Sequence, residues 1–395
     1  MLCGVAAMTV RTVAIVGAGI AGLAAALCLA RKGIKVHLFE QADRLEEVGA
    51  GLQLSPNATT VLATLGLLSA LEAQWLEPDR VVLASGRTLK PLTAVPVGVD
   101  ARRRWHFPYG VLHRATLQNV LLDAVRADPL ISLDLGKRID RYDGAALAAA
   151  IAAQLDLTIA ADGVWSTMRT AVPGAAPARF SGYIAWRFSV PFASAPHFLD
   201  ARCVTAWVGP SAHLVAYPLL EAKAFNLVAI HQGPAGRHDW STPPAAAGAA
   251  LRVEAFSGWN EAIVALLRNA DAPLAWPLYE CGDGRWFDGN GLILIGDAAH
   301  ATTPFAAQGA AMAIEDAAEL AAAVAGAADA NIALAAFETA RRKRLRRVRA
   351  RADFNRFAYH ARGPIALARD AVLALRSQAS LAADFDWLYG YRPAI

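Results

Sequence analysis

Cysteine and charge are both scarce in this chain. Its 395 residues include four cysteines, none in a Cys-x-x-Cys pair or beside paired histidines, which argues against a zinc site or a disulfide framework. We therefore expect no metal and a reducing, cytoplasmic location. Charged residues make up 18% of the sequence, less than the roughly 25% of an average globular chain. With a net charge of only +4, the composition does not favour a nucleic-acid binder.

Several signatures of other enzyme classes are missing as well. The sequence has no GxxxxGK phosphate loop, no HExxH zinc motif and no GxSxG nucleophile elbow. Much of the positive charge lies in one run, residues 341–351. Leu345 and Val348 recur there at helical spacing without interleaved aromatic residues, so we expect a solvated helix rather than a surface for nucleic acid or anionic membrane.

A long uncharged segment, residues 12–30, has the length of a signal peptide or membrane anchor. Gly17, Gly19 and Gly22 interrupt it, however, at the positions that a nucleotide-binding turn requires, and a strand-like run follows at 34–39. The pattern thus predicts strand, glycine turn, helix and strand, which is a right-handed βαβ unit without a membrane anchor.

The glycine turn has the GxGxxG spacing, and Glu40 ends the next strand eighteen residues after Gly22. Gly17 allows a tight turn, Gly19 lets the backbone approach a pyrophosphate, and Gly22 lets the helix pack on the sheet. The helix N-terminus supplies unpaired amides for the phosphates, and Glu40 would accept hydrogen bonds from the adenosine ribose. This motif alone leaves FAD and NAD equally open.

The rest of the chain alternates between two kinds of pattern. Short β-like pieces at 75–98 and an alternating, aromatic-rich stretch at 183–230 predict an antiparallel sheet. Helices are expected at 113–125, 306–325 and over most of 337–383, with a buried strand at 291–295. The nucleotide domain is therefore assembled from distant segments. In the least clear stretch, 140–159, Ala-rich residues stand where a hairpin would be expected.

Three later segments decide the nucleotide. Residues 291–316 read GLILIGDAAHATTPFAAQGAAMAIED, residues 160–169 read AADGVWSTMR, and residues 112–118 read LHRATLQ. With the loop VGAGLQLSPNA at 48–58 and the tail DWLYGY at 386–391, they resemble the group A FAD-dependent aromatic-ring monooxygenases, most closely the salicylate hydroxylase and 6-hydroxynicotinate 3-monooxygenase-like branch.

The resemblance implies non-covalent FAD and a role for each matching residue. Asp297 of the GD motif would bind the ribityl chain, Arg114 would lie near the phosphates, and Asp162 belongs to a DG motif linked to both FAD and NAD(P)H. Pro304 suits the first turn of a helix whose dipole would stabilise negative charge on the reduced flavin. The cofactor residues expected in all are Gly17, Gly19, Gly22, Glu40, Gln53, Arg114, Asp162, Gly296, Asp297 and Gly309.

The family chemistry implied is hydroxylation of a small phenol or hydroxypyridine. NAD(P)H reduces FAD, O2 adds at flavin C4a, and the hydroperoxide delivers OH to the ring. Residues 207–218 resemble the substrate sheet, so His213 and Tyr217, on one face of a strand, are the expected catalytic pair. Cys203, Pro304 and Phe305 are expected in the pocket. A lone strand histidine is also commonly structural, so that alternative stays open.

The fold class expected is α/β: a discontinuous Rossmann-like FAD-binding domain with an inserted mixed β-sheet substrate domain and C-terminal helices. Its partners would be a small aromatic substrate, O2 and NAD(P)H, without nucleic acid, in a monomer or homodimer. A flavin-dependent dehydrogenase or oxidase, or an idle flavoprotein that binds an aromatic ligand, is the alternative. The boundaries expected are 8–74, 101–182 and 274–336 for the FAD domain, 75–100 and 183–273 for the substrate domain, and 337–395 for the helical segment.

Overall fold

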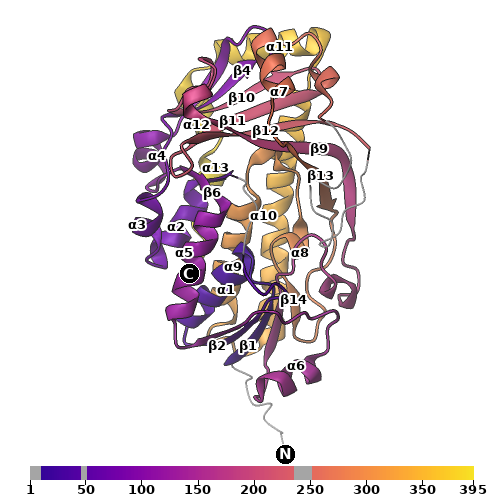
Figure 1. Cartoon of the computed structure of the whole chain (residues 1–395). Coiled ribbons are helices and arrows are strands. Elements are labelled where there is room, and N and C mark those ends of the chain that lie inside the picture. The colour runs from indigo at the N-terminus through magenta and orange to yellow at the C-terminus, as the bar shows by residue number, and fades with distance from the viewer. Residues whose placement is uncertain (1–9, 46–50, 235–250) are drawn as a thin grey trace, which may run out of the picture.

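The computed structural model describes residues 10–45, 51–234 and 251–395. A small parallel sheet lies at one end of the molecule and a broad mixed sheet at the other, with the long helix α10 (Ala330–Tyr359) running between them (Figure 1). Of the loop that resembles a flavin-flanking segment, Val48, Gly49 and Ala50 lie outside the described residues. Within the described ranges no helix is both long and apolar enough to cross a membrane.

The first sheet is entirely parallel, with strand order β14-β8-β1-β2-β7. Val13, Ala14, Ile15 and Val16 of its central strand are all buried, as expected for a strand covered on both faces. The opening βαβ unit predicted from the glycine spacing is confirmed. The strands are β1 (Thr12–Val16), β2 (Lys35–Phe39), β7 (Ile131–Asp134), β8 (Leu157–Ala160) and β14 (Leu292–Leu294).

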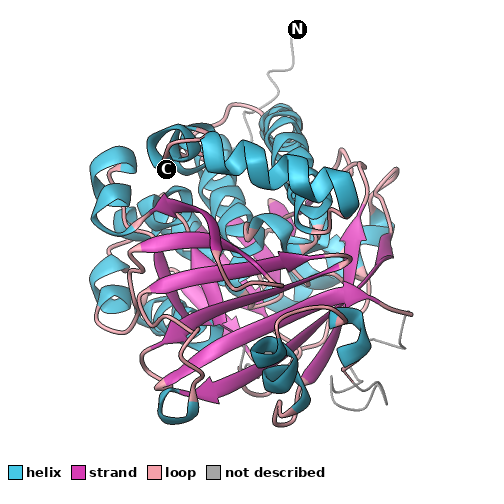
Figure 2. Ribbon diagram, turned by 90° about the horizontal axis from the view of Figure 1, so that it is seen from above, coloured by secondary structure: helices cyan, strands magenta, loops and turns pink. Residues whose placement is uncertain are grey.

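The second sheet has seven strands in the order β13-β9-β12-β11-β10-β4-β5, and Figure 2 looks down on it. All neighbours are antiparallel except β10 and β4. A separate pair, β3 (Gly51–Leu54) and β6 (Gly110–His113), lies between the sheets. The seven strands are β4 (Arg80–Ser85), β5 (Pro91–Pro96), β9 (Ala178–Pro191), β10 (Cys203–Gly209), β11 (Ala212–Leu219), β12 (Ala224–Gln232) and β13 (Leu274–Cys281).

The seven-stranded sheet is covered on both faces. One face packs on α7 (Glu261–Arg268) and a short 3-10 turn, with Trp186, Trp207 and Phe256 in the core between them. The opposite face points toward α10 and the rest of the molecule, with Tyr183 and Ile230 among its buried side chains. The predicted antiparallel sheet is confirmed, but it has no fully solvated face.

Helices cover the parallel sheet and link the two halves. Helix α9 packs on α1, α2 and α10, whereas α11 and α12 contact β5. Their bounds are α1 (Ile20–Arg31), α2 (Pro56–Thr64), α3 (Leu68–Glu72), α4 (Gly98–Trp105), α5 (Arg114–Ala127), α6 (Gly144–Ile151), α8 (Asp297–His300), α9 (Gly309–Val324), α11 (Gly363–Leu375), α12 (Gln378–Ala383) and α13 (Asp386–Tyr389).

The structure resolves one stretch that the sequence left unclear, and it differs from the sequence expectations at two points. In the unclear stretch 140–159, where Ala-rich residues stand in place of a hairpin, residues 144–151 form helix α6, capped by the Asp143 side chain on the amide of Ala146, because Ala-rich sequence favours helix. Strand β13 pairs with β9, so the chain leaves the second sheet after Cys281 rather than at 273. The predicted helix at 306–325 begins only at Gly309, behind a 3-10 turn.

Candidate active site

The glycine turn after β1 has the geometry that a dinucleotide requires. Gly17 has φ +104°, and a Cβ at Gly22 would stand 1.9 Å from the Gly17 carbonyl oxygen, so both positions exclude larger residues. A Cβ at Gly19 would meet nothing within 4 Å, which leaves open space beside the turn. Helix α1 begins there without a side-chain cap, so its first amides are available to phosphate oxygens.

Glu40 follows strand β2 and the GD segment follows strand β14, two strands of the parallel sheet that are separated by β1 and β8. The Glu40 carboxylate accepts hydrogen bonds from the amides of Ala18 at 2.8 Å and Ala42 at 2.9 Å, which fixes it beside the glycine turn. Gly296 has φ +57°, and its amide donates to Asp316 at 3.0 Å. The Asp297 side chain is exposed and, among the described residues, accepts no hydrogen bond, so both its oxygens are available to hydroxyl groups.

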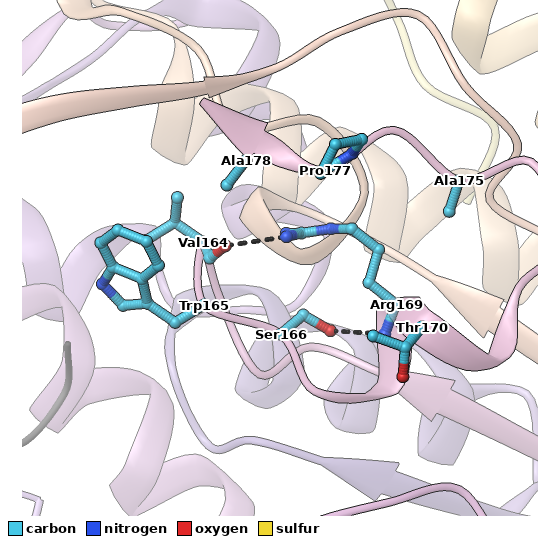
Figure 3. A pocket seen from close by; sticks show the side chains of 8 residues that line it. All are labelled: Val164, Trp165, Ser166, Arg169, Thr170, Ala175, Pro177 and Ala178. Atoms are coloured by element: carbon cyan, nitrogen blue, oxygen red, sulfur yellow. Dashed lines mark hydrogen bonds between the residues drawn. The ribbon is translucent and has the colours of Figure 1, made fainter. Parts of the chain in front are cut away.

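Asp162 lies within the DG segment, and Arg169 connects this segment to the GD segment. Asp162 Oδ2 accepts from the Thr167 amide at 3.0 Å, whereas Oδ1 is buried without a partner among the described residues, and burial raises the pKa of this carboxyl. The Arg169 guanidinium donates to the carbonyl oxygens of Ala298 at 2.8 Å and Val164 at 2.9 Å. Figure 3 shows Arg169 lining a cleft between this segment and the start of β9.

Gln53 and Arg114 come from the β3–β6 pair, Gln53 on β3 and Arg114 directly after β6. Gln53 on β3 accepts a hydrogen bond from the Tyr109 hydroxyl at 2.5 Å. Arg114 is the exposed first residue of α5. Gly309 is the exposed first residue of α9, which also lacks a side-chain cap. The segments that the sequence assigned to FAD thus contain two helix N-termini without side-chain caps and several oxygen atoms that can accept hydrogen bonds from hydroxyl groups.

His213 and Tyr217 lie on one face of β11, with Val215 between them. Val215 is the single residue of β11 that is not buried. Its partner on β12, Val228, and the partner of Val228 on β9, Arg187, are also partly exposed. Directly opposed residues of antiparallel strands share a face. A partly exposed row therefore crosses three strands between two buried side chains, His213 and Tyr217.

The His213 end of this row is aromatic. The His213 ring lies 5.2 Å from Phe305 and 5.4 Å from Tyr359 between centroids, and its Nδ1 is 2.9 Å from Nε2 of His360. Burial, followed by the neighbouring His360, holds the pKa of His213 well below its usual range. At the other end, burial raises the pKa of Tyr217 despite the Arg187 charge.

One predicted pocket residue is misplaced. Cys203 lies on the other face of the sheet, in the core with Trp207, and its thiol is 3.3 Å from Oδ2 of Asp200. It cannot share a pocket with His213, because Val204 and not Cys203 opposes Tyr217 in the β10–β11 register. Pro304 begins the 3-10 turn rather than α9, and Phe305 behind it is buried beside His213.

Comparison with known proteins identifies the family. A family model described as an FAD binding domain matches residues 10–355. The chain is 32% identical over 394 residues to 3-hydroxybenzoate 6-hydroxylase 1 of Aquipseudomonas alcaligenes, covering 96% of this chain and 98% of that protein. It is 30% identical over 316 residues to 6-hydroxynicotinate 3-monooxygenase of Bordetella bronchiseptica, covering 78% and 81%. The chain belongs to the group A FAD-dependent aromatic-ring monooxygenases.

The fold comparison agrees. The structure of a salicylate hydroxylase substrate complex matches this monooxygenase with a TM-score of 0.75 at 23% identity, covering 97% of this chain and 96% of that one. This match supports the predicted fold class, and the family model with the curated relatives confirms the predicted FAD cofactor and aromatic monooxygenase activity. The open space at Gly19, the unpartnered Asp162 oxygen and the available Asp297 carboxylate fit such a cofactor. When bound, FAD supplies electron transfer and oxygen activation.

Sequence reasoning missed a buried ionic network in this monooxygenase. Arg341, 1% exposed, donates to Glu315 and Asp316 at 2.8 Å each, and both carboxylates are fully buried. Arg344 also donates to Glu315. Burial raises the pKa of Asp316, but His300 and Arg341 outweigh it and bring that pKa to about 2. Two adjacent acids inside an Ala-rich helix were the signal in the sequence.

This network fixes the cofactor segments. Asp316 also accepts the Gly296 amide, so it holds the GD turn, and Glu315 accepts from Asn57 Nδ2 at 2.6 Å on α2. The expectation that residues 341–351 form a solvated helix is wrong in part, because the helix carries Arg341 and Leu345 into the core. The run is helical, but several of its charges serve internal ion pairs.

Proposed function

We propose that this monooxygenase hydroxylates a small aromatic or heteroaromatic ring that carries both a hydroxyl group and a carboxylate, as a phenol or hydroxypyridine acid, using NAD(P)H and O2. The observation that carries the proposal is the partly exposed row Val215, Val228 and Arg187 between His213 and Tyr217. Two valines offer a flat apolar surface for a ring, whereas Arg187 offers a cation at its end.

Arg187 supports the carboxylate. Its guanidinium lies 5.9 Å from the Trp276 ring centroid, and its charge acts on Tyr217. A planar guanidinium suits a carboxylate because two parallel hydrogen bonds fix the orientation of the substrate. The named relatives act on hydroxybenzoate and hydroxynicotinate, which combine the same two groups.

His213 and Tyr217 would act on the ring hydroxyl. A neutral His213 has one nitrogen to offer, because Nδ1 faces His360. That nitrogen, Nε2, would hold the phenolic hydrogen, and loss of the proton would make the ring more electron-rich. Tyr217, whose pKa is raised by burial, stays protonated and would donate to the substrate. The buried aromatic side chains Phe305 and Tyr359 would exclude water.

The cleft of Figure 3 supports the use of NAD(P)H. Trp165 lies at the cleft and makes an edge-to-face contact with Tyr279, with 4.3 Å between the ring centroids. The DG segment that forms the cleft resembles the family segment linked to this cosubstrate. We place the approach of the nicotinamide cosubstrate there. For the same protein we propose a cytoplasmic location, because Cys28, Cys203 and Cys281 are buried free thiols. We also propose that it is a monomer or a homodimer, and light scattering would measure which.

The test uses purified, FAD-loaded protein. NADH and NADPH oxidation are followed with 3-hydroxybenzoate, 2-hydroxybenzoate and 6-hydroxynicotinate, and with phenol and 2-hydroxypyridine as carboxylate-free controls, and products are identified by incorporation of ¹⁸O from ¹⁸O2. We expect a hydroxylated product only from a carboxylate. Equal turnover of phenol would refute the proposed substrate class, and oxidation that yields only H2O2 would count against the acids tried.

An arginine pair on β9 provides a matched comparison. Arg187→Met should raise KM for the carboxylate about 10- to 100-fold, since a charge-assisted hydrogen bond contributes about 1.5–3 kcal/mol. Arg179→Met, which removes an exposed arginine from the same strand, should leave KM unchanged. An equal effect of both substitutions would show that Arg187 is not the carboxylate ligand.

A further inference from the structure

His213 does not stand alone on the sheet. Its Nδ1 lies 2.9 Å from Nε2 of His360, the residue that follows α10, 147 positions later in the chain. The two rings are 5.1 Å apart between centroids and tilted by 44°. Tyr183 and Phe305 flank the pair, with Tyr183 5.4 Å and Phe305 5.6 Å from His360. Side chains from the seven-stranded sheet, from the 3-10 turn at Pro304–Ala306 and from the end of α10 thus fix both imidazoles.

The far nitrogen of His360, Nδ1, faces away from His213. His360 Nδ1 is buried without a hydrogen bond among the described residues, although the residue as a whole is only partly buried. A neutral imidazole carries one N–H and one lone pair. Whichever tautomer is present, this nitrogen therefore lacks either an acceptor or a donor, and a water molecule reaching the end of α10 would satisfy it.

Electrostatics make the pair a poor place to hold a proton. Burial lowers the pKa of His213, and burial with Arg356 and Arg362 lowers that of His360 to about 4. The groups that face the pair from the sheet, the 3-10 turn (Pro304–Ala306) and α10 are Tyr183, Phe305 and Tyr359, none of which is a carboxylate. A general base for a phenol should have a pKa near the working pH, so His213 by itself is badly matched to that role.

We propose that His213 and His360 form a proton relay between the substrate hydroxyl and solvent at the end of α10, with His360 as the positioning residue that sets the tautomer of His213. This rests on the proposed function. The phenolic O–H bond breaks and its proton joins Nε2 of His213. The proton on Nδ1 of His213 passes to Nε2 of His360, and the proton on Nδ1 of His360 leaves to water. The pair ends neutral in its other tautomer, and the reverse sequence returns a proton to the product.

The relay predicts separate effects on binding and on proton transfer. Because bulk water is the final proton acceptor, the extent to which the substrate hydroxyl ionises depends on the pKa of that hydroxyl and not on the pKa of His213. His360→Gln keeps a hydrogen-bonding group beside His213 but cannot pass a proton on, whereas His360→Ala leaves room for added imidazole. His231→Gln is the matched control, because His231 is a buried histidine of the same sheet that bonds Trp186 on the opposite face.

The experiment mixes anaerobic, oxidised holoenzyme with 4-hydroxy-3-nitrobenzoate, whose ionisation changes its visible absorbance. We expect His360→Gln to slow ionisation of the bound probe by a factor on the order of 10², with Kd unchanged. Imidazole should restore the rate in His360→Ala, and His231→Gln should match wild type. Wild-type ionisation rates in His360→Gln, or slowing that imidazole does not relieve in His360→Ala, would overturn the relay.

A second readout needs no substrate. In holoenzyme labelled with [¹⁵N]histidine, the relay predicts that His213 exchanges between two neutral tautomers, and that His360→Gln fixes it in one. A single His213 tautomer in wild type would overturn the relay. If the probe fails to bind wild type while tautomer exchange is present, the substrate class is wrong and the relay stands.

Discussion

Replacing Arg341 tests whether the buried ionic network stabilises the cofactor half. Arg341→Met retains apolar volume but removes the charge that faces Glu315 and Asp316. Breaking a buried ion pair by removing one partner costs about 3–5 kcal/mol. Here Arg344 still pairs with Glu315, and Asp316 keeps His300 and the Gly296 amide, so we expect the lower end of that range.

The expected change is measurable as a shift in Tm. An unfolding entropy of about 2 cal/mol/K per residue converts about 3 kcal/mol into a decrease of about 4 °C for 395 residues. The assay is thermal unfolding of the holoenzyme, followed by circular dichroism and by the rise in fluorescence of released flavin. Because Asp316 also holds the GD turn, flavin release should come at a lower temperature by the same amount.

The control is the next residue on the same helix. Arg342 pairs with Asp283 at the surface, where the two side chains are 23% and 47% exposed. An exposed pair contributes about 0–1 kcal/mol, so Arg342→Met should lower Tm by about 1 °C or less. If Arg341→Met lowered Tm no more than Arg342→Met, the buried network would not be a stabilising element and the reasoning would fail.

Three further predictions concern the site. Asp297→Ala should weaken FAD binding about 10- to 100-fold, because a charged acceptor for the ribityl hydroxyls is lost, and titration of apoprotein with FAD measures it. The free energy of unfolding should fall as the pH drops from about 6.5 toward 4. His360, with a pKa of about 4, stays unprotonated in the folded state, whereas the same histidine in the unfolded chain takes up a proton. Urea unfolding midpoints measured between pH 7.5 and 5 would detect this fall, and midpoints that do not change with pH would contradict it. Cys203→Ser should leave KM for the aromatic substrate unchanged, because Cys203 faces the other core; a raised KM with normal folding would place it in the pocket.

The sequence predicts best what depends on local spacing. The glycine turn is the clearest case, because Gly17 has a positive φ and Gly22 packs against the Gly17 carbonyl oxygen only five positions earlier in the chain. Cys203 was misplaced because the face of a residue depends on register, and a slip of one residue reverses it. Strands β10 and β11 pair Gly209 with Ala212 across a two-residue loop, so reading that loop as a tight hairpin would have put Val204 opposite Tyr217.

Contacts between distant segments have no counterpart in local sequence. His360 meets His213 only because α10 crosses from the parallel sheet to the mixed sheet, and Arg187 joins the substrate face only through two successive strand registers. Residues 341–351 were predicted to form a solvated helix from helical spacing without aromatic residues, whereas the ion-pair partners of Arg341 lie on α9. In each case the deciding partner is fixed by tertiary packing rather than by spacing.

The order of the parallel sheet bears on how the protein is made. Strand β8 pairs with β1 on one side and with β14 on the other, so the sheet is complete only after about three quarters of the chain has been synthesised. Such non-local pairing is slow, and until it forms the apolar edge of β8 is open to other chains. The yield of soluble recombinant protein should therefore depend on growth temperature and on chaperone supply. Flavin supply should affect this yield only at the late stage of folding at which β14 and the GD turn have joined the sheet.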